Sequence, residues 1–333
     1  MRDRADLHAS VTRIADLESL DYEVEPLPRD EWSRGDYVVA RVSRRPGSDV
    51  RVENTVGRRV ELMEGESLVG ALGTRRATRG YVGGWRDVEA DGSMQVLTGG
   101  GVLGRVTSTS PFSPRPIDVD YVGHVLRDGV VKMEDHSLDG DGEVDVPVVL
   151  VTGTSMSAGK TMSGRVLTRV LVEEGYDVAG CKLTGAGTYN DVLALEVAGA
   201  DPIYDFVDAG LPTTVVEEGV YRQAITGVLD AVSSADVVVA EVGASPLEPY
   251  NGEAAVDLLG DAVAFSVLCA TDPYAVVGIE EAFDVEPDVV AGIATNTSAG
   301  VDLVEELAGR RALNLGLEDA KQPLREMLLE ALG

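Results

Sequence analysis

The chain has 333 residues, 57 acidic and 28 basic, which gives a net charge of −29 at pH 7. The acids are dispersed along the chain, a pattern typical of halophilic proteins, and the absence of a basic face argues against a nucleic-acid or membrane partner. No long apolar span and no secretory leader stand out, so we expect a soluble, cytoplasmic protein.

The first 140 residues read as a β-rich domain with a leading helix. Apolar residues recur at helical spacing from Asp6 to Leu20, which predicts the helix. Short β-rich runs then follow between Gly and Asp-Gly turns, and we expect a small barrel. The runs are 37–42, 50–56, 60–63, 68–72 and 94–97. An acidic, Gly-rich stretch, Asp139 to Asp145, reads as a linker.

Residues 146–333 read as a second domain with a different pattern. Continuous apolar runs alternate with helical stretches, which indicates an α/β fold with a mostly parallel sheet covered on both faces. The expected strands are 147–151, 177–182, 237–241, 263–269, 289–294 and 312–315. In such sheets ligands bind at the carboxyl ends of the strands, so the loops after each strand are the candidate site.

The loop after the first of these strands has the features of a phosphate-binding P-loop. Gly153 and Gly159 let the backbone approach an anion, Lys160 supplies a charge for the β/γ-phosphates, and Thr161 offers a hydroxyl to Mg²⁺. Five residues separate the glycines, one more than in the common consensus. The predicted nucleotide-binding residues are Gly153, Thr154, Ser155, Met156, Ser157, Ala158, Gly159, Lys160 and Thr161.

Four more polar residues stand at or after later strand ends: Lys182, Asp191, Glu241 and Asn296. Lys182 is one of four lysines in the chain, and Glu241 leaves an apolar run where a carboxylate can hold Mg²⁺. Asn296 has the donor and acceptor atoms that match a purine edge. The alternatives are a solvated lysine, a helix cap at Asp191 or Asn296, and a structural acid at Glu241.

Together these motifs resemble the dethiobiotin synthetase family of P-loop enzymes. The loop is similar to that family's Gly-Thr-Asp-Thr-x-x-Gly-Lys-Thr, with Ser155 and Met156 departing from it. Lys182-Leu-Thr-Gly, the Asn-Asp-Val-Leu-Ala-Leu segment from 190 and Glu241-Val-Gly-Ala resemble further family motifs in the same order. The resemblance covers the second half only, and the family's Pro-x-x-Ser-Pro-His segment has no counterpart.

The resemblance implies an ATP- and Mg²⁺-dependent site. Thr161, Asp191 and Glu241 would surround Mg²⁺, Lys160 and Lys182 would be the catalytic lysines that neutralise the transferring phosphate, and Asn296 would read adenine. The family's acceptor is a carboxylate or carbamate, which implies a small anionic metabolite. We expect Thr184, in the loop that follows Lys182, to contact that substrate. A homodimer is a further expectation from such families.

A Gly-rich segment of the first domain concentrates arginines in an otherwise acidic protein. Arg75, Arg76 and Arg79 have fork-like donors that suit a carboxylate or phosphate, so they are candidate substrate residues. The alternative is that they pair with neighbouring acids.

The sequence therefore predicts a phosphoryl-transfer or ligase-type enzyme that uses ATP and Mg²⁺. Two alternatives stay open. One is a nucleotide-hydrolysing regulatory switch. The other is an acyltransferase, because the second half is also similar to a P-loop family that contains a D-glutamate N-acetyltransferase. The sequence has no Asn-Lys-x-Asp guanine signature, which favours ATP over GTP.

Overall fold

The computed structural model describes residues 5–44, 50–140, 142, 144–283 and 286–333. The chain divides into two compact units. Unit 1 consists of Met1–Asp139, Ala186–Asn190 and Phe206–Glu217. Unit 2 consists of Gly140–Gly185, Asp191–Asp205 and Glu218–Gly333. The expected linker, Asp139–Asp145, includes residues 141 and 143, which lie outside the described residues.

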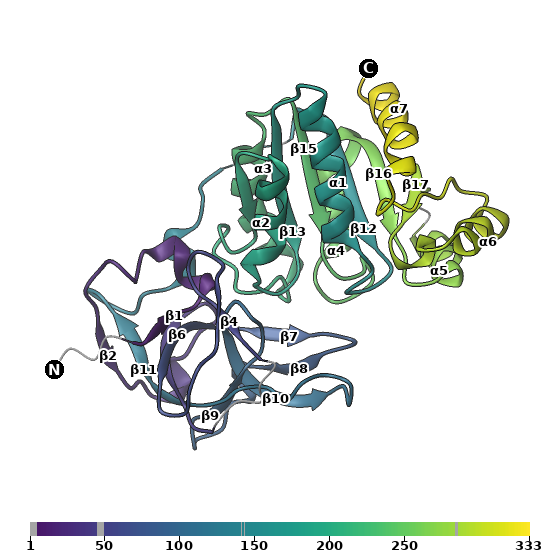
Figure 1. The fold of residues 1–333 in the computed structure, drawn as a ribbon. Helices are drawn as coiled ribbons and strands as arrows, with labels where there is room; N and C mark the ends of the chain where they lie inside the picture. The colour runs from purple at the N-terminus through teal and green to yellow at the C-terminus, as the bar shows by residue number, and fades with distance from the viewer. Residues whose placement is uncertain (1–4, 45–49, 141, 143, 284–285) are drawn as a thin grey trace. The chain divides into compact units, whose positions relative to one another are not determined.

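Unit 1 is built on a nine-stranded sheet that closes on itself (Figure 1). The path runs from β6 through β3, β11 and β9 to β10, and β10 then pairs with β6, so five strands form a closed barrel. The strands are β1 (Leu7–His8), β2 (Glu23–Glu25), β3 (Tyr37–Val42), β6 (Ser67–Leu72), β7 (Thr74–Arg76), β8 (Tyr81–Gly84), β9 (Ser93–Val96), β10 (Val102–Thr109) and β11 (Asp118–Leu126). A separate two-stranded sheet joins β4 (Val52–Glu53) to β5 (Arg59–Val60).

The predicted helix over residues 6–20 is wrong. The chain forms β1, which pairs with β6 in parallel, and then the 3₁₀ helix η1 (Ser10–Ala15). The amide of Ala9 donates to the carbonyl of Val69 at 3.0 Å, so the sheet takes a backbone group that a helix would use itself. Pairing with β6 therefore overrides the local helical spacing.

The sequence located strand β3 to the residue but missed two of the longest strands of the barrel. Residues 37–42 form β3 as expected. Strands β10 and β11 were not predicted, because Gly104, Gly123 and several polar residues interrupt their apolar pattern. Further short elements of unit 1 are the 3₁₀ helices η2 (Arg29–Glu31), η3 (Trp85–Asp87) and η4 (Met133–His136).

Unit 2 contains a six-stranded sheet in the order β14-β13-β15-β12-β16-β17, and every pairing is parallel. The strands are β12 (Val148–Gly153), β13 (Val178–Thr184), β14 (Ile203–Asp205), β15 (Val237–Val242), β16 (Val263–Cys269) and β17 (Val289–Ala291). The expected α/β class with a mostly parallel sheet is confirmed. Strand β12 lies between β15 and β16, so the loop after it emerges in the middle of the sheet.

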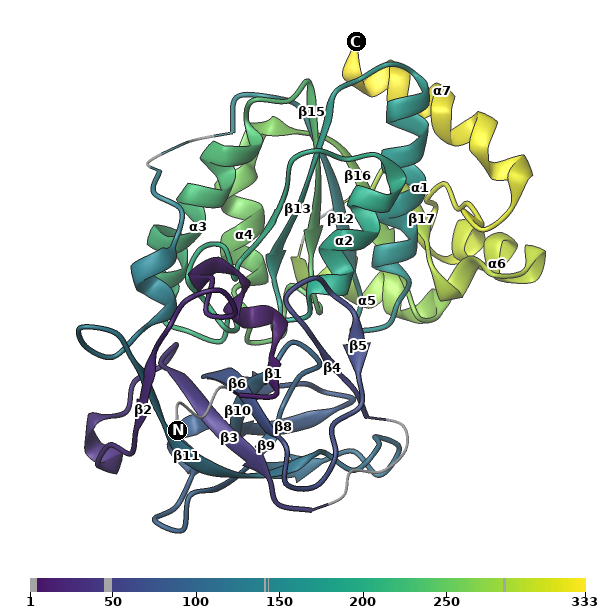
Figure 2. The same cartoon turned by 60° about the vertical axis from the view of Figure 1, so that its left-hand side comes forward.

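Helices cover both faces of this sheet. Figure 2 shows α3 and α4 on one side of the strands and α1 and α2 on the other. The helices are α1 (Lys160–Glu173), α2 (Tyr189–Ala198), α3 (Glu218–Val232), α4 (Gly252–Leu259), α5 (Pro273–Phe283), α6 (Ser298–Ala308) and α7 (Lys321–Leu332), with the 3₁₀ helices η5 (Gly260–Ala262), η6 (Ile293–Thr295) and η7 (Glu318–Ala320). Burial on both faces explains why the strands read as continuous apolar runs.

Two details of unit 2 differ from the sequence prediction. Strand β14 was missed, because three residues are too few to show a period. The expected strand over 312–315 is wrong: within the ranges that the structure describes, this segment forms an isolated bridge between Val290 and Ala312 and no strand. Among the described residues, no helix has the length and apolar character needed to cross a membrane.

Helix α1 is held to the sheet by a stripe of buried side chains that includes Leu171, which has 0% exposure. We expect Leu171→Ala to lower the free energy of unfolding by about 2–5 kcal/mol, because the deletion leaves a cavity under the helix. Leu307 on α6 is 43% exposed, so Leu307→Ala is the matched control, with an effect within about 0.5 kcal/mol. Urea unfolding measures both, and equal losses would contradict this packing.

Candidate functional site

The loop between β12 and α1 has the conformation that a phosphate-binding loop needs. Strand β12 ends at Gly153 and α1 begins at Lys160. Ser157 and Gly159 adopt positive φ angles of 61° and 109°, which turn the chain sharply before the helix. The amides of this turn and of the first helical residues have no partner within the helix, so they can bind an anion. This strand, loop and helix form a P-loop, as in P-loop NTPases.

Lys160 is buried, and its side chain reaches back to the start of the loop. Lys160 is 6% exposed, and its Nζ donates to the carbonyl of Ser155 at 2.9 Å. Burial lowers the pKa of Lys160, while the carboxylate of Glu241 opposes the effect. The ammonium is therefore held inside the loop, where the phosphates of a nucleotide would lie.

A second buried lysine lies between two carboxylates. Lys182 is 7% exposed and forms an ion pair with Asp191, at the start of α2. Its Nζ is also 3.8 Å from Oε1 of Glu241, the residue opposite it on β15. Burial alone would lower the pKa of Lys182, but the carboxylates of Asp191 and Glu241 raise it overall. Lys182 is thus a fixed cation and not a solvated surface lysine.

Glu241 links this ion pair to the P-loop. The hydroxyl of Thr161 donates to Oε2 of Glu241 at 3.2 Å. Glu241 is 4% exposed, and its burial raises its pKa, although Lys182 opposes the shift. The acid therefore lies between Thr161 on α1 and Lys182 on β13.

This donor set fits Mg²⁺ bound together with a nucleotide. A hydroxyl and a carboxylate are hard oxygen donors, and Mg²⁺ usually takes one or two protein ligands besides phosphate oxygens and water. Thr161 and Glu241 would supply these oxygens. Asp191, the third expected ligand, forms an ion pair with Lys182, which also lies 3.8 Å from Glu241. Within the described part of the chain, no three His, Cys, Asp or Glu residues gather as a metal site, so the protein alone offers no complete cage.

The loop with Asn296 is built against the P-loop. The amide of Ile293 donates to the carbonyl of Ala158 at 3.1 Å. Gly292 has φ of 89°, and a Cβ there would lie 2.2 Å from the same carbonyl, so only glycine fits. Asn296 itself is exposed, and its carbonyl accepts a hydrogen bond from Nδ2 of Asn314 at 3.1 Å. The Asn296 loop therefore contacts the P-loop through Ile293 and the segment with Asn314 through its own carbonyl.

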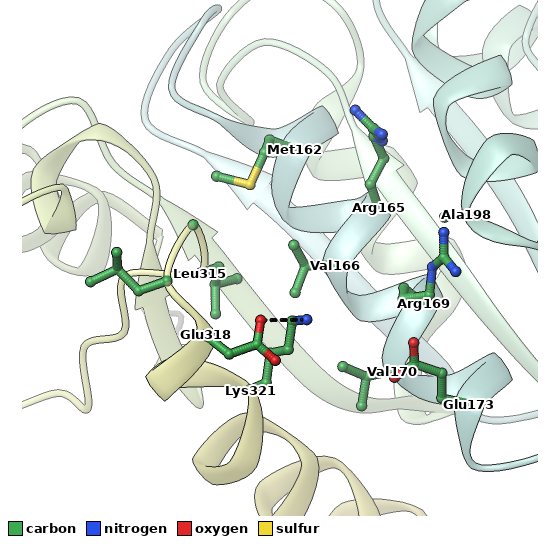
Figure 3. Close-up of a pocket in the computed structure, with 12 residues that line it drawn as sticks. Met162, Arg165, Val166, Arg169, Val170, Glu173, Ala198, Leu315, Glu318 and Lys321 are labelled. Atoms are coloured by element: carbon green, nitrogen blue, oxygen red, sulfur yellow. Dashed lines mark ion pairs between the residues drawn. The ribbon is translucent and has the colours of Figure 1, made fainter.

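A groove of about 490 Å³ lies between α1 and the segment that leads into α7 (Figure 3). Met162, Val166 and Val170 form its apolar side on the helix, and Leu315 to Leu317 form the facing segment. Figure 3 shows the Glu318–Lys321 ion pair facing the Val166 and Val170 side chains, and Arg165 and Arg169 along the helix. The groove extends along the helix from Met162 to Glu173, and neither Asn296 nor a residue of the P-loop lines it.

Two of the four predicted substrate residues, Thr184 and Arg75, are engaged in contacts within the protein. The hydroxyl of Thr184 donates to the carbonyl of Gly243 at 3.0 Å, and the residue is fully buried. Arg75 donates to the carbonyl of Leu97 and stacks on Tyr81, 5.3 Å from the ring centre. Arg76, at the end of β7, and Arg79 in the following turn are exposed. All three arginines belong to unit 1.

Sequence reasoning missed the groove and the role of Gly292. The groove combines residues about 150 positions apart in the chain, so no local pattern reports it. The signal for Gly292 was present: a glycine directly after the strand that precedes Asn296 is the residue type for a close backbone approach.

No protein-family model matches this sequence, and no curated protein matches it. Three similar solved structures are HypB, a hydrogenase maturation factor from Archaeoglobus fulgidus, the signal recognition particle receptor FtsY from Elizabethkingia anophelis, and a DUF1611 family protein from Anabaena variabilis. Their identities are 16%, 16% and 17%, with TM-scores of 0.41, 0.40 and 0.39. The matches cover 56%, 60% and 59% of this chain and 91%, 68% and 61% of theirs. TM-scores below 0.5 do not establish a shared function.

Gly292 should be required for the P-loop and the Asn296 loop to pack together. We expect Gly292→Ala to weaken nucleotide binding at least about tenfold and to cost about 1–3 kcal/mol of stability, because of the strain at positive φ and the clash with Ala158. Gly219→Ala on α3 is the control: nothing lies within 4 Å of its added methyl, and we expect no loss. Titration with a fluorescent ATP analogue and urea unfolding measure both variants. Unchanged binding in Gly292→Ala would contradict the contact.

Proposed function

We propose that this protein is a Mg²⁺-dependent nucleoside triphosphatase that binds ATP, and that hydrolysis drives a change of state in the protein. The observation that carries the proposal is the contact between Thr161 and Glu241, 3.2 Å apart at the ends of neighbouring elements of a P-loop fold. A metal-binding hydroxyl, a buried acid and a buried lysine thus meet at one end of the sheet. These are the parts that phosphoryl transfer to water requires.

The residues of the chain have distinct roles in this reaction. The loop amides and Lys160 bind the phosphate oxygens and neutralise the charge that develops on the transferring group. Mg²⁺, when bound, would supply further neutralisation between the phosphates. Lys182 fixes Glu241 from the side opposite Thr161, so the acid keeps one orientation toward the site.

Adenine is the base that the Asn296 loop suits best. Reading guanine selectively calls for an acceptor such as a carboxylate for its N1–H and amino group, and the segment Asn296-Thr297-Ser298-Ala299 contains no acid. Thr297 is used as a helix cap, since its side chain accepts from the amide of Gly300 at 3.2 Å. The Asn296 amide therefore supplies the donor and acceptor for a purine edge. The order of motifs that resembles dethiobiotin synthetases supports the same base.

The link to a change of state comes from the course of the chain. Strands β13 and β14 belong to unit 2, but the segments that continue from them, Ala186–Asn190 and Phe206–Glu217, belong to unit 1. Rearrangement at the ends of these strands would therefore be transmitted along the backbone. This continuity of the chain supports a nucleotide-driven switch.

Removal of the loop lysine tests the proposal. We expect Lys160→Ala to lower ATP hydrolysis by at least about 100-fold, because it removes a charge that stabilises the transition state. The wild type should hydrolyse ATP faster than GTP. Lys132 in unit 1 lies outside the site, so Lys132→Ala is the matched control and should keep full activity. Phosphate release with Mg²⁺ measures the rates, and circular dichroism confirms folding. Full activity in a folded Lys160→Ala variant would refute the assignment.

A second candidate is phosphoryl transfer from ATP to a small carboxylate. The observation that favours it is Lys182, a second buried cation, at the end of β13, the strand next to β15. Besides its contacts with Asp191 and Glu241, a cation beyond the phosphate-binding loop suits an anionic acceptor. The acceptor would become an acyl phosphate, with ADP as the other product.

Hydroxylamine trapping separates the two candidates. If a carboxylate is the acceptor, ATP turnover should rise in the presence of one member of a panel of small mono- and dicarboxylates, and hydroxylamine should capture an equivalent amount of hydroxamate. The hydrolysis proposal predicts phosphate release without any carboxylate and no hydroxamate. Hydroxamate formed in proportion to ADP would establish the second candidate instead.

A further inference from the structure

A second cavity of about 490 Å³ lies wholly within unit 1. It shares no lining residue with the groove beside α1, and both positive and negative side chains line it. The lining residues are Val50, Arg51, Glu53, Arg59, Tyr81, Gly99, Pro114 and Thr188. The two arginines were not among those that the sequence singled out.

Glu53 supplies the negative charge of this cavity. The residue is 1% exposed, and its two oxygens have different surroundings. Oε2 accepts from the amide of Tyr189 at 2.8 Å and from the hydroxyl of Ser10 at 3.4 Å. Oε1 is buried and has no hydrogen-bond donor among the described residues. A buried carboxylate oxygen without a donor is unusual, because such atoms are nearly always satisfied.

The nearest cation does not satisfy this oxygen. Nε of Arg59 lies 3.8 Å from Oε1, beyond hydrogen-bond distance, and the Arg59 side chain is 62% exposed. Arg51 is exposed, and in the described part of the chain its side chain has no ion pair or hydrogen bond. The cavity therefore presents one buried acceptor and two guanidinium groups with donors to spare.

We propose that this cavity binds a small zwitterion. Its protonated amine would donate to Oε1 of Glu53, and its anionic group would be bound by the guanidinium groups of Arg51 and Arg59. A simple anion would leave Glu53 without a donor, and a simple cation would meet two arginines. A molecule with both charges satisfies all three side chains, because guanidinium forks match carboxylate and phosphate groups. The anionic group is a carboxylate, as in an amino acid, or a phosphate monoester.

This site is connected by the chain to the nucleotide site, although the proposal does not depend on hydrolysis. Thr188 lines the cavity, and the amide of Tyr189 holds Glu53. Asp191, the partner of Lys182, follows two residues after Tyr189. A ligand that orders Thr188 and Tyr189 would therefore also restrain the start of α2.

Isothermal titration calorimetry of the full chain without nucleotide tests the binding directly. The probes are the common α-amino acids, γ-aminobutyrate, phosphoethanolamine and phosphoserine, each at millimolar concentration. For the tightest binder, two analogues follow, one without the amine and one with the anionic group esterified. We expect each analogue to bind at least about tenfold more weakly. Binding of amino acids alone would identify the anionic group as a carboxylate, and binding of phosphoethanolamine would identify it as a phosphate.

Three variants locate the site. We expect Glu53→Gln and Arg51→Gln to weaken the tightest probe at least about tenfold, with Arg58→Gln, an exposed arginine outside the cavity lining, as the matched control. Because Glu53 also accepts a hydrogen bond from Tyr189, Glu53→Gln can lower the stability of the fold. In that case the affinity of Arg51→Gln, which changes an exposed side chain, is the deciding measurement.

The proposal would be overturned if no probe bound, if the analogue without an amine bound equally well, or if Arg51→Gln bound like the wild type. ATP hydrolysis by Lys160→Ala plays no part in these readouts. A negative result in the zwitterion titrations therefore leaves the triphosphatase proposal intact. A negative result in the phosphate-release assay likewise leaves the zwitterion site intact.

Discussion

The burial of Lys182 is the constraint on which the rest of the candidate site depends. A buried charge without a partner costs on the order of several kcal/mol, so the chain must bring carboxylates to it. Asp191 and Glu241 meet this requirement from two different elements, and their positions are fixed by it. Glu241 in turn orients toward Thr161. One ion cluster therefore sets the start of α2, the end of β15 and the first turn of α1.

A second chain of contacts is made through main-chain carbonyls and carries no charge. The carbonyl of Ala158 accepts from Ile293, and the carbonyl of Asn296 accepts from Asn314. The first contact ties the P-loop to the Asn296 loop, and the second ties that loop to the segment that forms the groove. Because Gly292 has no side chain, the two loops can approach closely. The P-loop, the Asn296 loop and the segment that begins at Asn314 are thus held together by hydrogen bonds to main-chain carbonyls.

The sequence revealed the parts of the fold that local pattern determines. The long buried strands of unit 2 appear as apolar runs because helices cover both of their faces, and the P-loop is recognisable because each of its residues has a local task. The N-terminal segment was predicted wrongly as a helix, because its structure depends on pairing with β6, about 60 residues away. Strands β10 and β11 escaped notice for the same reason: partner strands, and not their own residue pattern, hold them in the barrel.

The arginines show the same limit at a site. Arg75, Arg76 and Arg79 are close in sequence, and this proximity made them candidates, yet Arg75 is bound to a main-chain carbonyl. Arg51 and Arg59 are eight positions apart and drew no attention, although they share a cavity with Glu53. What gives that cavity its character is the contact of Glu53 with Tyr189, 136 residues away. Charge density along a chain therefore shows where a protein can bind an anion, whereas the folded arrangement decides which charges remain available.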